Sequence, residues 1–246
     1  MRFDTAEVSL LGDRDENQDR YGVLETPESV LLAVLDGMGG HEGGARAAQA
    51  ALESLRRSFE SAGPGVAPET FLRDAVARAH KDVVAIGSDL PVASRPRATC
   101  AVCLVRDGQA SWAHVGDARV YHLRDGAMLE RTRDHTPVEQ LLQDGLISEA
   151  EIQGHPMRHY VEYCLGGFTE LPEITVAGPR TLAPGDILVV CSDGLWSGIA
   201  DPDLAASSRD ALALDGWIAR LAGRAVRQNT PYSDNTTAVA LRMAED

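Results

Sequence analysis

Three apolar stretches of this chain stop or start beside an aspartate, and this pattern constrains the fold more than any other feature. The stretch at residues 31–35 runs directly into Asp36, a second one ends just before Asp193, and a third begins just after Asp234. Short apolar runs bounded by polar residues and glycine are typical of buried β-strands. Because neighbouring strands of a sheet lie close together, the carboxylates at their ends can meet at one point. We therefore expect a strand-rich protein with an acidic site at a sheet edge.

The middle of the chain predicts antiparallel strands joined by tight turns. Asp-Gly pairs at residues 107–108 and 125–126 separate apolar runs, which is the strongest short-range signal for a β-hairpin. Neighbouring strands of this kind belong to antiparallel sheets rather than to a parallel β-α-β series. The predicted strands are Thr99–Val105, Ala110–Val115, Ala118–Leu123, Met128–Thr132, Asp186–Cys191 and Thr236–Met243.

Helices are expected on both sides of this strand-rich block. Residues 42–60 are rich in Ala, Leu, Arg and Glu, residues 71–86 repeat the pattern, and residues 201–227 are mostly helical in composition. Elements in this order indicate an α+β protein in which two antiparallel sheets pack together with helices outside. Because the sequence has no long linker, we expect one domain, residues 1–246, with a flap at about 135–171.

Composition places the protein among ordinary globular chains and excludes some partners. The 246 residues are 44% hydrophobic and 24% charged, and the formal net charge is −14. An acidic surface repels phosphate backbones, so nucleic acid and anionic membranes are not expected as partners. The N-terminal residues lack the apolar core of a signal peptide, and no apolar run reaches the ~18 residues of a membrane span. We therefore expect a cytoplasmic protein.

Cys100 and Cys103 form a C-x-x-C pair, which could indicate a redox or zinc site. However, the surrounding residues predict a strand, on which positions three apart face opposite sides. The sequence also contains no second C-x-x-C pair. We therefore interpret both cysteines as small buried hydrophobic residues.

Two further aspartates lie beside predicted strands. Asp19 precedes an apolar run near the N-terminus, and Asp117 lies between two strands of the central block. A single aspartate at a strand end is usually a cap or a turn former. Five such residues, each next to a strand, instead favour a metal site. Carboxylate oxygens without paired His or Cys ligands select hard cations such as Mg²⁺, Mn²⁺ or Ca²⁺.

A pair of divalent ions would make this acidic site a catalyst. Crowded carboxylates are unfavourable without cations, and two ions bridged by one carboxylate can share and acidify a water molecule for attack on phosphorus. The backbone carbonyl of Gly37 could be a further ligand. The calcium-loop spacing D-x-D-x-D-G is absent from the sequence, which argues against a calcium sensor. Arg14 could bind two phosphate oxygens with its planar guanidinium group, although an ordinary solvated arginine is the alternative interpretation.

Five short motifs occur in order along the chain. They are R-D-E-N-Q-D (Arg14 to Asp19), D-G-M-G-G-H (Asp36 to His41), G-D-A-R-V-Y (Gly116 to Tyr121), S-D-G-L (Ser192 to Leu195) and D-N-T-T (Asp234 to Thr237). Together they resemble the signature motifs of the metal-dependent serine/threonine protein phosphatases of type 2C, in the bacterial branch of that family. Each motif is weak alone, but five in this order and spacing are specific and span nearly the whole chain.

This resemblance implies a fold and a set of residue roles. The fold would be a four-layer α-β-β-α sandwich of two antiparallel sheets flanked by helices, with a two-metal site at one edge. Arg14 would bind the substrate phosphate, and Asn235 would orient Asp234 or a bound water. The implied metal ligands are Asp36 bridging both ions, the Gly37 carbonyl, Asp193, Asp234, Asp19 through water, and Asp117, which with Asp193 would hold a weaker third ion.

The chain departs from the family pattern at three places. Ala118 stands where many bacterial members have serine, and Ala98-Thr99 stands where Gly-Thr or Gly-Ser is usual. Met38 stands where eukaryotic relatives have a histidine proposed as the general acid. His41, three residues further on, is the candidate that protonates the leaving alkoxide, and a structural or solvent role is the alternative.

The activity that the resemblance implies is hydrolysis of phosphoserine and phosphothreonine in proteins, with Mn²⁺ preferred over Mg²⁺. We expect a monomer whose partners are phosphorylated proteins, namely a Ser/Thr kinase and the targets of that kinase. Two alternatives stay open. A catalytically weak scaffold could bind a kinase or a phosphoprotein, although none of the expected metal-site aspartates is missing. A two-metal phosphohydrolase could instead act on small phosphate esters.

Overall fold

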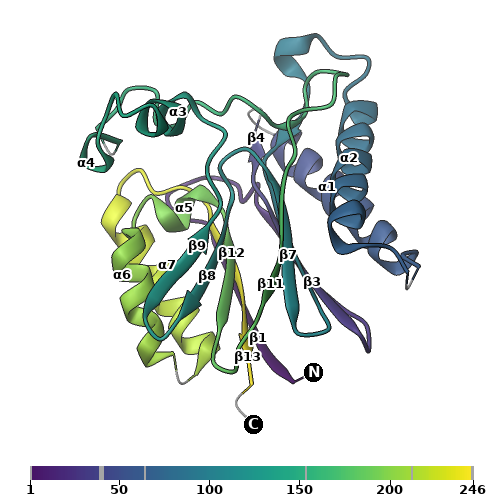
Figure 1. Ribbon diagram of the computed structural model, residues 1–246. Helices are drawn as coiled ribbons and strands as arrows, with labels where there is room; N and C mark the ends of the chain where they lie inside the picture. Colours follow the sequence, from purple (N-terminus) through teal and green to yellow (C-terminus); the bar gives the residue numbers. More distant parts are fainter. Residues whose placement is uncertain (1, 39–41, 64, 153, 212, 245–246) are drawn as a thin grey trace.

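The computed structural model describes residues 2–38, 42–63, 65–152, 154–211 and 213–244. Within them, two large antiparallel sheets stack face to face, and helices cover the outer face of each sheet (Figure 1). The predicted α+β architecture, a four-layer α-β-β-α sandwich of two antiparallel sheets flanked by helices, is confirmed.

The first sheet joins the two ends of the chain. Its strands are β1 (Phe3–Leu10), β8 (Arg119–Arg124), β9 (Ala127–Arg131), β12 (Ile187–Cys191) and β13 (Thr236–Met243), in the order β1-β13-β12-β8-β9. Strand β1 pairs with β13 over its full length. The helices that pack on the outer face are α5 (Asp193–Trp196), α6 (Asp201–Ser207) and α7 (Leu214–Asn229), with the 3₁₀ helix η2 (Ser208–Asp210) between the last two.

The second sheet contains the most deeply buried strand of the N-terminal half. Its strands are β2 (Arg20–Glu25), β3 (Ser29–Leu35), β6 (Cys100–Arg106), β7 (Gln109–Val115) and β11 (Thr175–Thr181), in the order β11-β7-β6-β3-β2. Helices α1 (Glu42–Glu60) and α2 (Pro68–Ile86) cover its outer face. Helix α2 begins three residues before the predicted start at Phe71, because Pro68 is tolerated in the first turn of a helix.

A third, small sheet lies at the end of the sandwich. It consists of β4 (Gly37–Met38), β5 (Arg97–Ala98) and β10 (Leu165–Gly166), in the order β10-β5-β4. The sequence did not predict it, because strands of two residues leave no readable periodicity. The remaining short elements are the 3₁₀ helix η1 (Val92–Ser94) and, within the flap, α3 (Pro137–Gln143) and α4 (Glu149–Ile152).

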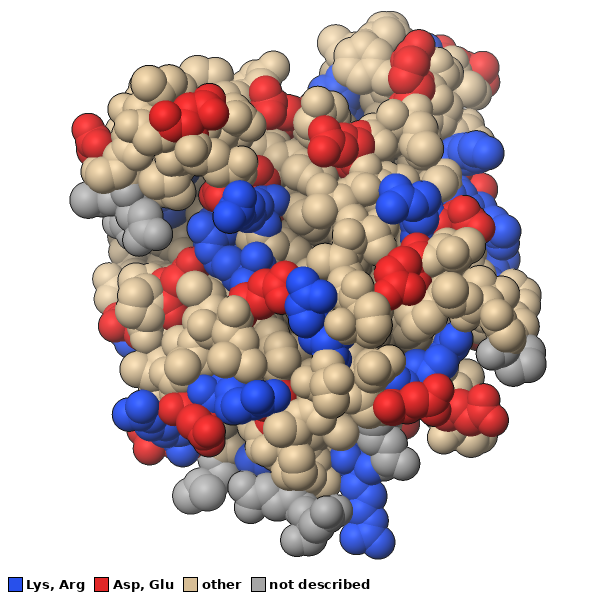
Figure 2. Space-filling view, in the orientation of Figure 1, with Lys and Arg blue, Asp and Glu red and all other residues tan. Residues whose placement is uncertain are grey.

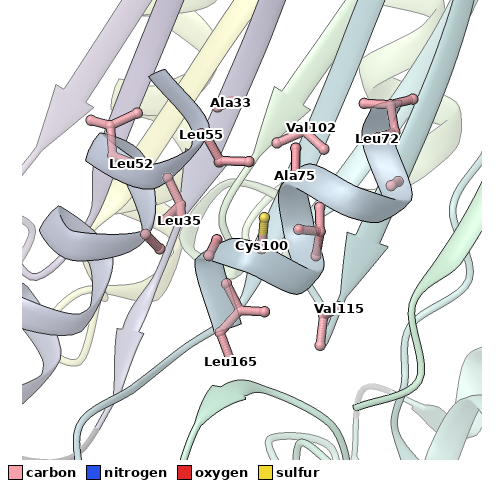
Figure 3. Packing of buried hydrophobic residues seen from close by; sticks show 14 of the residues in the cluster. Ala33, Leu35, Leu52, Leu55, Leu72, Ala75, Cys100, Val102, Val115 and Leu165 are labelled. Atoms are coloured by element: carbon pink, nitrogen blue, oxygen red, sulfur yellow. The ribbon is translucent and has the colours of Figure 1, made fainter. Parts of the chain in front are cut away.

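Strand β3 is buried on both faces, which explains its unbroken apolar run. Leu31 and Leu35 belong to the core cluster beneath α1 and α2, whereas Leu32 and Val34 face the other sheet. Figure 3 shows Leu35 beside Leu55 of α1 in the helix-side cluster. Each such buried leucine contributes roughly 2 kcal/mol relative to an exposed one. A strand without a solvated face ends where the first charge appears, so its last residues define the rim of the sandwich.

The two cysteines of the C-x-x-C pair lie on opposite faces of strand β6. Cys100 packs in the helix-side cluster and Cys103 in the cluster between the sheets. Both thiols are free, and burial raises the pKa of each to about 12. The interpretation of these residues as core hydrophobes is therefore confirmed.

Candidate functional site

The candidate site lies at the end of the sandwich where β3 and β12 end and β13 begins, near β4 and α5 in Figure 1. Asp36 follows β3, Asp193 opens α5 after β12, and Asp234 precedes β13. Together with Asp117 they line an open pocket of about 760 Å³. Both sheets thus contribute carboxylates to one pocket, whereas the sequence predicted that strands of a single sheet would do so.

Asp19 lies beneath this pocket rather than on its wall. Its side chain is only 4% exposed and accepts a 2.8 Å hydrogen bond from Ser192 Oγ at its Oδ2 atom. Burial raises the pKa of Asp19 to about 7, and the negative charges of Asp193 and Asp234 add to the effect. A carboxyl group held in this state belongs to the acidic cluster and is not an ordinary turn former.

Three further carboxylates of the cluster, those of Asp36, Asp117 and Asp193, are also kept from ionising easily. Loss of hydration raises the pKa of Asp36 well above its usual range, with further increases from Asp19 and Asp193. Burial raises the pKa of Asp117 in the same direction, and it raises that of Asp193 to about 6. The cause in each case is the removal of a charge from water, followed by repulsion between like charges.

The donor set fits hard divalent cations. The residues that converge offer oxygen atoms, and Asp193 Oδ1 has no hydrogen-bond partner in the described part of the chain. Among the described residues, no group of three or more His, Cys, Asp or Glu side chains is placed so that it could hold a metal ion by itself. The cluster is therefore open, so that a backbone carbonyl and water would have to complete the coordination of any ion.

Two glycines allow the backbones around the site to approach one another. A Cβ atom on Gly37 would lie 2.2 Å from the carbonyl oxygen of Gly44 in α1 and 2.7 Å from that of Gln18. A Cβ atom on Gly194 would lie 2.1 Å from the carbonyl oxygen of Asn235. Glycine after each of the two aspartates is therefore required by packing, and it leaves the Gly37 backbone at the pocket wall.

Arg14 lies in the pocket and pairs with one of the predicted metal ligands. Its Nη2 atom donates to Asp234 Oδ2 at 2.6 Å, although the Arg14 side chain is 57% exposed. The backbone N–H of Asn235 donates to the other oxygen of Asp234 at 2.8 Å. Asp234 thus has local partners on both oxygens, whereas Asp193 does not.

The Asn235 side chain forms hydrogen bonds with the backbone of the N-terminal loop and none with Asp234 among the described contacts. Its Oδ1 accepts from the backbone N–H of Gln18, and its Nδ2 donates to the carbonyl oxygens of Leu11 and Glu16. These bonds fasten the loop that carries Arg14 to the start of β13. Only the backbone of Asn235 contacts Asp234, so the side chain positions the loop instead of orienting the carboxylate.

The flap contributes three pocket-lining residues that the sequence did not reveal. They are Arg158, His159 and Val161, and His159 Nδ1 lies 4.0 Å from Asp193 Oδ2. No motif or periodicity marked them, because the flap is polar and irregular. Met38 lines the pocket as well. His41, the predicted proton donor, lies outside the described residues.

A buried ion pair supports Asp117 from behind. Arg119 donates two hydrogen bonds to Asp134, at 2.8 and 2.7 Å, and its guanidinium lies 3.8 Å from the ring centre of Trp196. Trp196 Nε1 in turn donates to the carbonyl oxygen of Asp117 at 2.9 Å. Arg119 belongs to the G-D-A-R motif, so its proximity to the site was readable, but its partner Asp134 was not.

On the face shown in Figure 2, acidic and basic side chains are interspersed and form no continuous basic patch. Within the described residues, no helix has both the length and the apolarity that crossing a membrane would require.

Known proteins are similar to this chain in sequence and in fold. Residues 9–224 match the family described as protein phosphatase 2C. The serine/threonine phosphatase stp of Listeria welshimeri is 28% identical over 197 residues, which cover 78% of this chain and 77% of that protein.

Two solved structures superpose on nearly the whole chain. The serine/threonine phosphatase PstP/Ppp of Mycobacterium tuberculosis has a TM-score of 0.84 at 28% identity, covering 99% of both chains. The catalytic domain of PstP in complex with two manganese ions has a TM-score of 0.81 at 28% identity, again covering 99% of both. With a family match over most of its length and this shared architecture, the chain belongs to the protein phosphatase 2C family.

Proposed function

We propose that this chain is a metal-dependent serine/threonine protein phosphatase whose active site is the acidic pocket. In this proposal Asp36, Asp193 and Asp234 hold two Mn²⁺ or Mg²⁺ ions, with Asp36 between them and the Gly37 carbonyl as a further ligand. Mn²⁺ is the expected better activator.

Two more aspartates complete the proposed site. Asp19 supports it through water, in keeping with its place beneath the pocket and its bond to Ser192. Asp117, acting with Asp193, holds a weaker third ion. The raised pKa of each of these three groups supports a role in which a cation compensates the charge.

The observation that carries the proposal is uncompensated negative charge in a pocket. Asp193 Oδ1 has no hydrogen-bond partner within the described chain, and Oδ2 lies 4.0 Å from Nδ1 of His159, whose pKa is lowered by burial. Arg14 and Arg158 offset only part of the Asp193 charge, since its pKa stays raised. Burying a carboxylate without compensating its charge is unfavourable. Carboxylates with raised pKa values in a cleft therefore indicate a functional site. Hard divalent cations are the ligands that this oxygen-rich set prefers.

The chain's own residues orient the substrate. When bound, a pair of divalent cations lowers the pKa of water and withdraws charge from a phosphoryl group. Arg14 can bind two phosphate oxygens at once, and its 2.6 Å bond to Asp234 keeps the guanidinium inside the pocket. With Asp234 holding a cation, the Arg14 guanidinium would be available to a phosphate group in the same pocket.

The finer parts of the function are predictions that follow from this assignment. His41 is the candidate that protonates the leaving alkoxide, with solvent as the alternative. The expected substrates are phosphorylated proteins, among them a Ser/Thr kinase and its targets. A cytoplasmic location, a monomeric state, a single domain at residues 1–246 and a flap at about 135–171 also stay predictions.

The decisive experiment measures phosphate release from a phosphothreonine peptide. We expect turnover with Mn²⁺ or Mg²⁺, loss of turnover with a chelator, and a decrease on the order of 10³-fold in an Asp36→Asn variant. Asp74→Asn on the exposed face of α2 is the matched control and should retain full activity. Wild-type turnover in Asp36→Asn would refute the assignment.

The two alternative activities are outcomes of the same assay. A scaffold would bind the phosphopeptide with no metal-dependent release of phosphate. An enzyme for small phosphate esters would hydrolyse nucleotides or p-nitrophenyl phosphate far better than the peptide, and the nucleotides would compete with it. A protein phosphatase should prefer the peptide in kcat/KM.

A further inference from the structure

The turn that carries Asp117 is held by an unusual number of contacts from distant parts of the chain. The backbone N–H of Gly116 donates to His135 Nδ1 at 3.2 Å, and the Gly116 carbonyl accepts from the backbone N–H of His135 at 2.9 Å. The next carbonyl, that of Asp117, accepts from Trp196 Nε1. Three backbone polar groups of this turn are therefore satisfied by residues at least 19 positions away in sequence.

His135 also joins the start of the flap to its later residues 162 and 163. It is the first flap residue, and its carbonyl oxygen accepts from the backbone N–H of Glu162 at 2.9 Å. The ring of Tyr163 contacts the His135 ring edge to face, with centroids 5.5 Å apart. On its far side, His135 Nε2 lies 2.9 Å from Thr175 Oγ1 in β11. One side chain thus meets the Asp117 turn, the returning flap and a strand of the second sheet.

The hydrogen bonds of the ring determine its protonation state. Nδ1 accepts from Gly116, so the proton resides on Nε2, which donates to Thr175. Burial lowers the pKa of His135, which favours this neutral form. A histidine that only filled space in the core would not need an acceptor aimed at a backbone N–H and a donor aimed at a hydroxyl.

The turn is also packed tightly against the residue that contacts Asp36. Gly116 has φ +94°, and a Cβ atom on it would lie 2.7 Å from Thr99 Cγ2 and 3.3 Å from the Tyr163 carbonyl oxygen. The backbone N–H of Thr99 donates to the carbonyl oxygen of Asp36 at 2.8 Å. A movement of His135 would therefore displace the turn that carries Asp117. Through Thr99 it would also displace the backbone of Asp36.

We propose that His135 is a positioning residue that clamps the start of the flap and its residues 162–163 to the Gly116–Asp117 turn and so couples the flap to the Asp117 carboxylate. Its action requires the Nδ1 acceptor, because that atom holds the turn. The Nε2 bond to Thr175 fixes the ring orientation and is secondary. The coupling to catalysis rests on the proposed metal-ligand role of Asp117, whereas the clamp itself does not.

The variants separate the two ring nitrogens. The His135→Asn variant places a hydrogen-bond acceptor near the position of Nδ1 but cannot reach Thr175. The His135→Gln variant reaches toward Thr175 but offers no acceptor at the position of Nδ1. Thr175→Val removes the Nε2 partner alone, and His155→Ala serves as a control because His155 is a flap histidine whose described bond is local.

The first readout is amide hydrogen exchange of the metal-free protein, which is independent of activity. We expect the Gly116 amide to exchange about tenfold faster in His135→Ala and His135→Gln, with faster exchange at residues 162–163 as well. His135→Asn, Thr175→Val and His155→Ala should stay within about threefold of the wild type. If His135→Ala fails to fold, the comparison of Asn with Gln decides.

The second readout is the Mn²⁺ concentration that gives half-maximal hydrolysis of p-nitrophenyl phosphate. This Mn²⁺ concentration should rise about fivefold in His135→Ala, with little change in kcat at saturating Mn²⁺. In His135→Asn it should return to the wild-type value. Equal exchange at Gly116 in the wild type, Asn and Gln proteins would overturn the clamp. If exchange responds and the Mn²⁺ requirement does not, the coupling to Asp117 is wrong while the clamp stands. Loss of the proposed function would instead appear as inactivity of every variant and of the wild type.

Discussion

Strand β12 has an aspartate near each end, and the two differ in their hydrogen-bond partners and in the direction of their pKa shift. Asp186 precedes the strand, is fully buried, and receives hydrogen bonds from His122, Arg124 and the backbone of Ala183. These donors outweigh burial and lower its pKa. Asp193 follows the strand, has one oxygen without a partner among the described residues, and has its pKa raised to about 6 by burial and by neighbouring carboxylates.

This contrast separates a structural carboxylate from a functional one. Asp186 carries its own cation, Arg124, so its charge is compensated when the chain folds. Burial and Asp234 oppose the charge of Asp193, and Arg14 and Arg158 offset only part of this, so a bound cation would have to supply the remaining compensation. Burial alone does not distinguish them, since both are withdrawn from water, and only the partners do.

The largest expected effect comes from removing the charge at the functional end. Asp193→Asn should lower kcat on a phosphothreonine peptide on the order of 10³-fold, because a metal ligand is lost. The same change removes repulsion with Asp36 and Asp234, so the metal-free protein should be equally stable or more stable by about 1 kcal/mol. Kinetics and urea unfolding of one preparation measure both quantities. A variant that loses stability as well as activity would mean that Asp193 is structural.

The opposite result is expected at the structural end. Asp186→Asn should lower the free energy of unfolding by about 2 kcal/mol, because a buried carboxylate that satisfies several donors is replaced by a neutral group. The value is modest because Arg124 is partly exposed and can return to water. The kcat of the folded protein should change less than about threefold. Urea unfolding and the same peptide assay provide the measurement, and a large fall in kcat at full stability would break the comparison.

Metal binding should stabilise one end of β12 only. At a Mn²⁺ concentration about 100-fold above Kd, the free energy of unfolding should rise by about 2.7 kcal/mol, and a chelator should reverse the rise. Asp186→Asn should show the same increase, whereas Asp193→Asn should show much less of it. Thermal unfolding with and without Mn²⁺ tests this, and an equal increase in the wild type and Asp193→Asn would contradict the site.

The smallest effect is in the pH dependence of the metal-free protein. Asp193 and Asp19 have folded pKa values of about 6 and about 7, above the ordinary value of 3.8. Their ionisation therefore costs stability, which is lost as pH rises from about 4 to 7. The contribution of Asp186 has the opposite sign, since its pKa is lowered: it is present above the ordinary value and is lost as pH falls below it.

Burial also lowers the pKa of His80, His114 and His135, so these residues add to the pH dependence and a difference measurement is needed. We expect the free energy of unfolding of Asp193→Asn, minus that of the wild type, to increase by about 1 kcal/mol between pH 5 and pH 7.5 without metal. With saturating Mn²⁺ the wild type should instead gain stability over this interval, because the metal competes with protons. A difference that is flat with pH would mean that Asp193 is ionised at no cost.

Much of the fold could be predicted because burial leaves a local trace. Residues 29–35 are apolar without interruption since β3 is covered on both faces, and the Asp-Gly turns at 107–108 and 125–126 mark hairpins with positive φ at both aspartates. Helix α1 has the predicted bounds, since its composition and the preceding glycines mark its start. The two-residue strands and the contacts of the flap left no such trace, and Arg158, His159 and Asp134 were missed for that reason.

The sequence by itself determined which segments form apolar strands and which carboxylates lie at their ends. Burial of a strand requires apolar side chains, so it is visible in the local pattern of residues. The sequence could not determine which of these carboxylates would find a cation within the protein. Asp186 and Asp193 flank the same five-residue strand, yet Arg124 and His122 of β8 reach only the first of them. That choice depends on which strands pair and in which register, and Coulomb energies depend on distances that only the tertiary structure supplies.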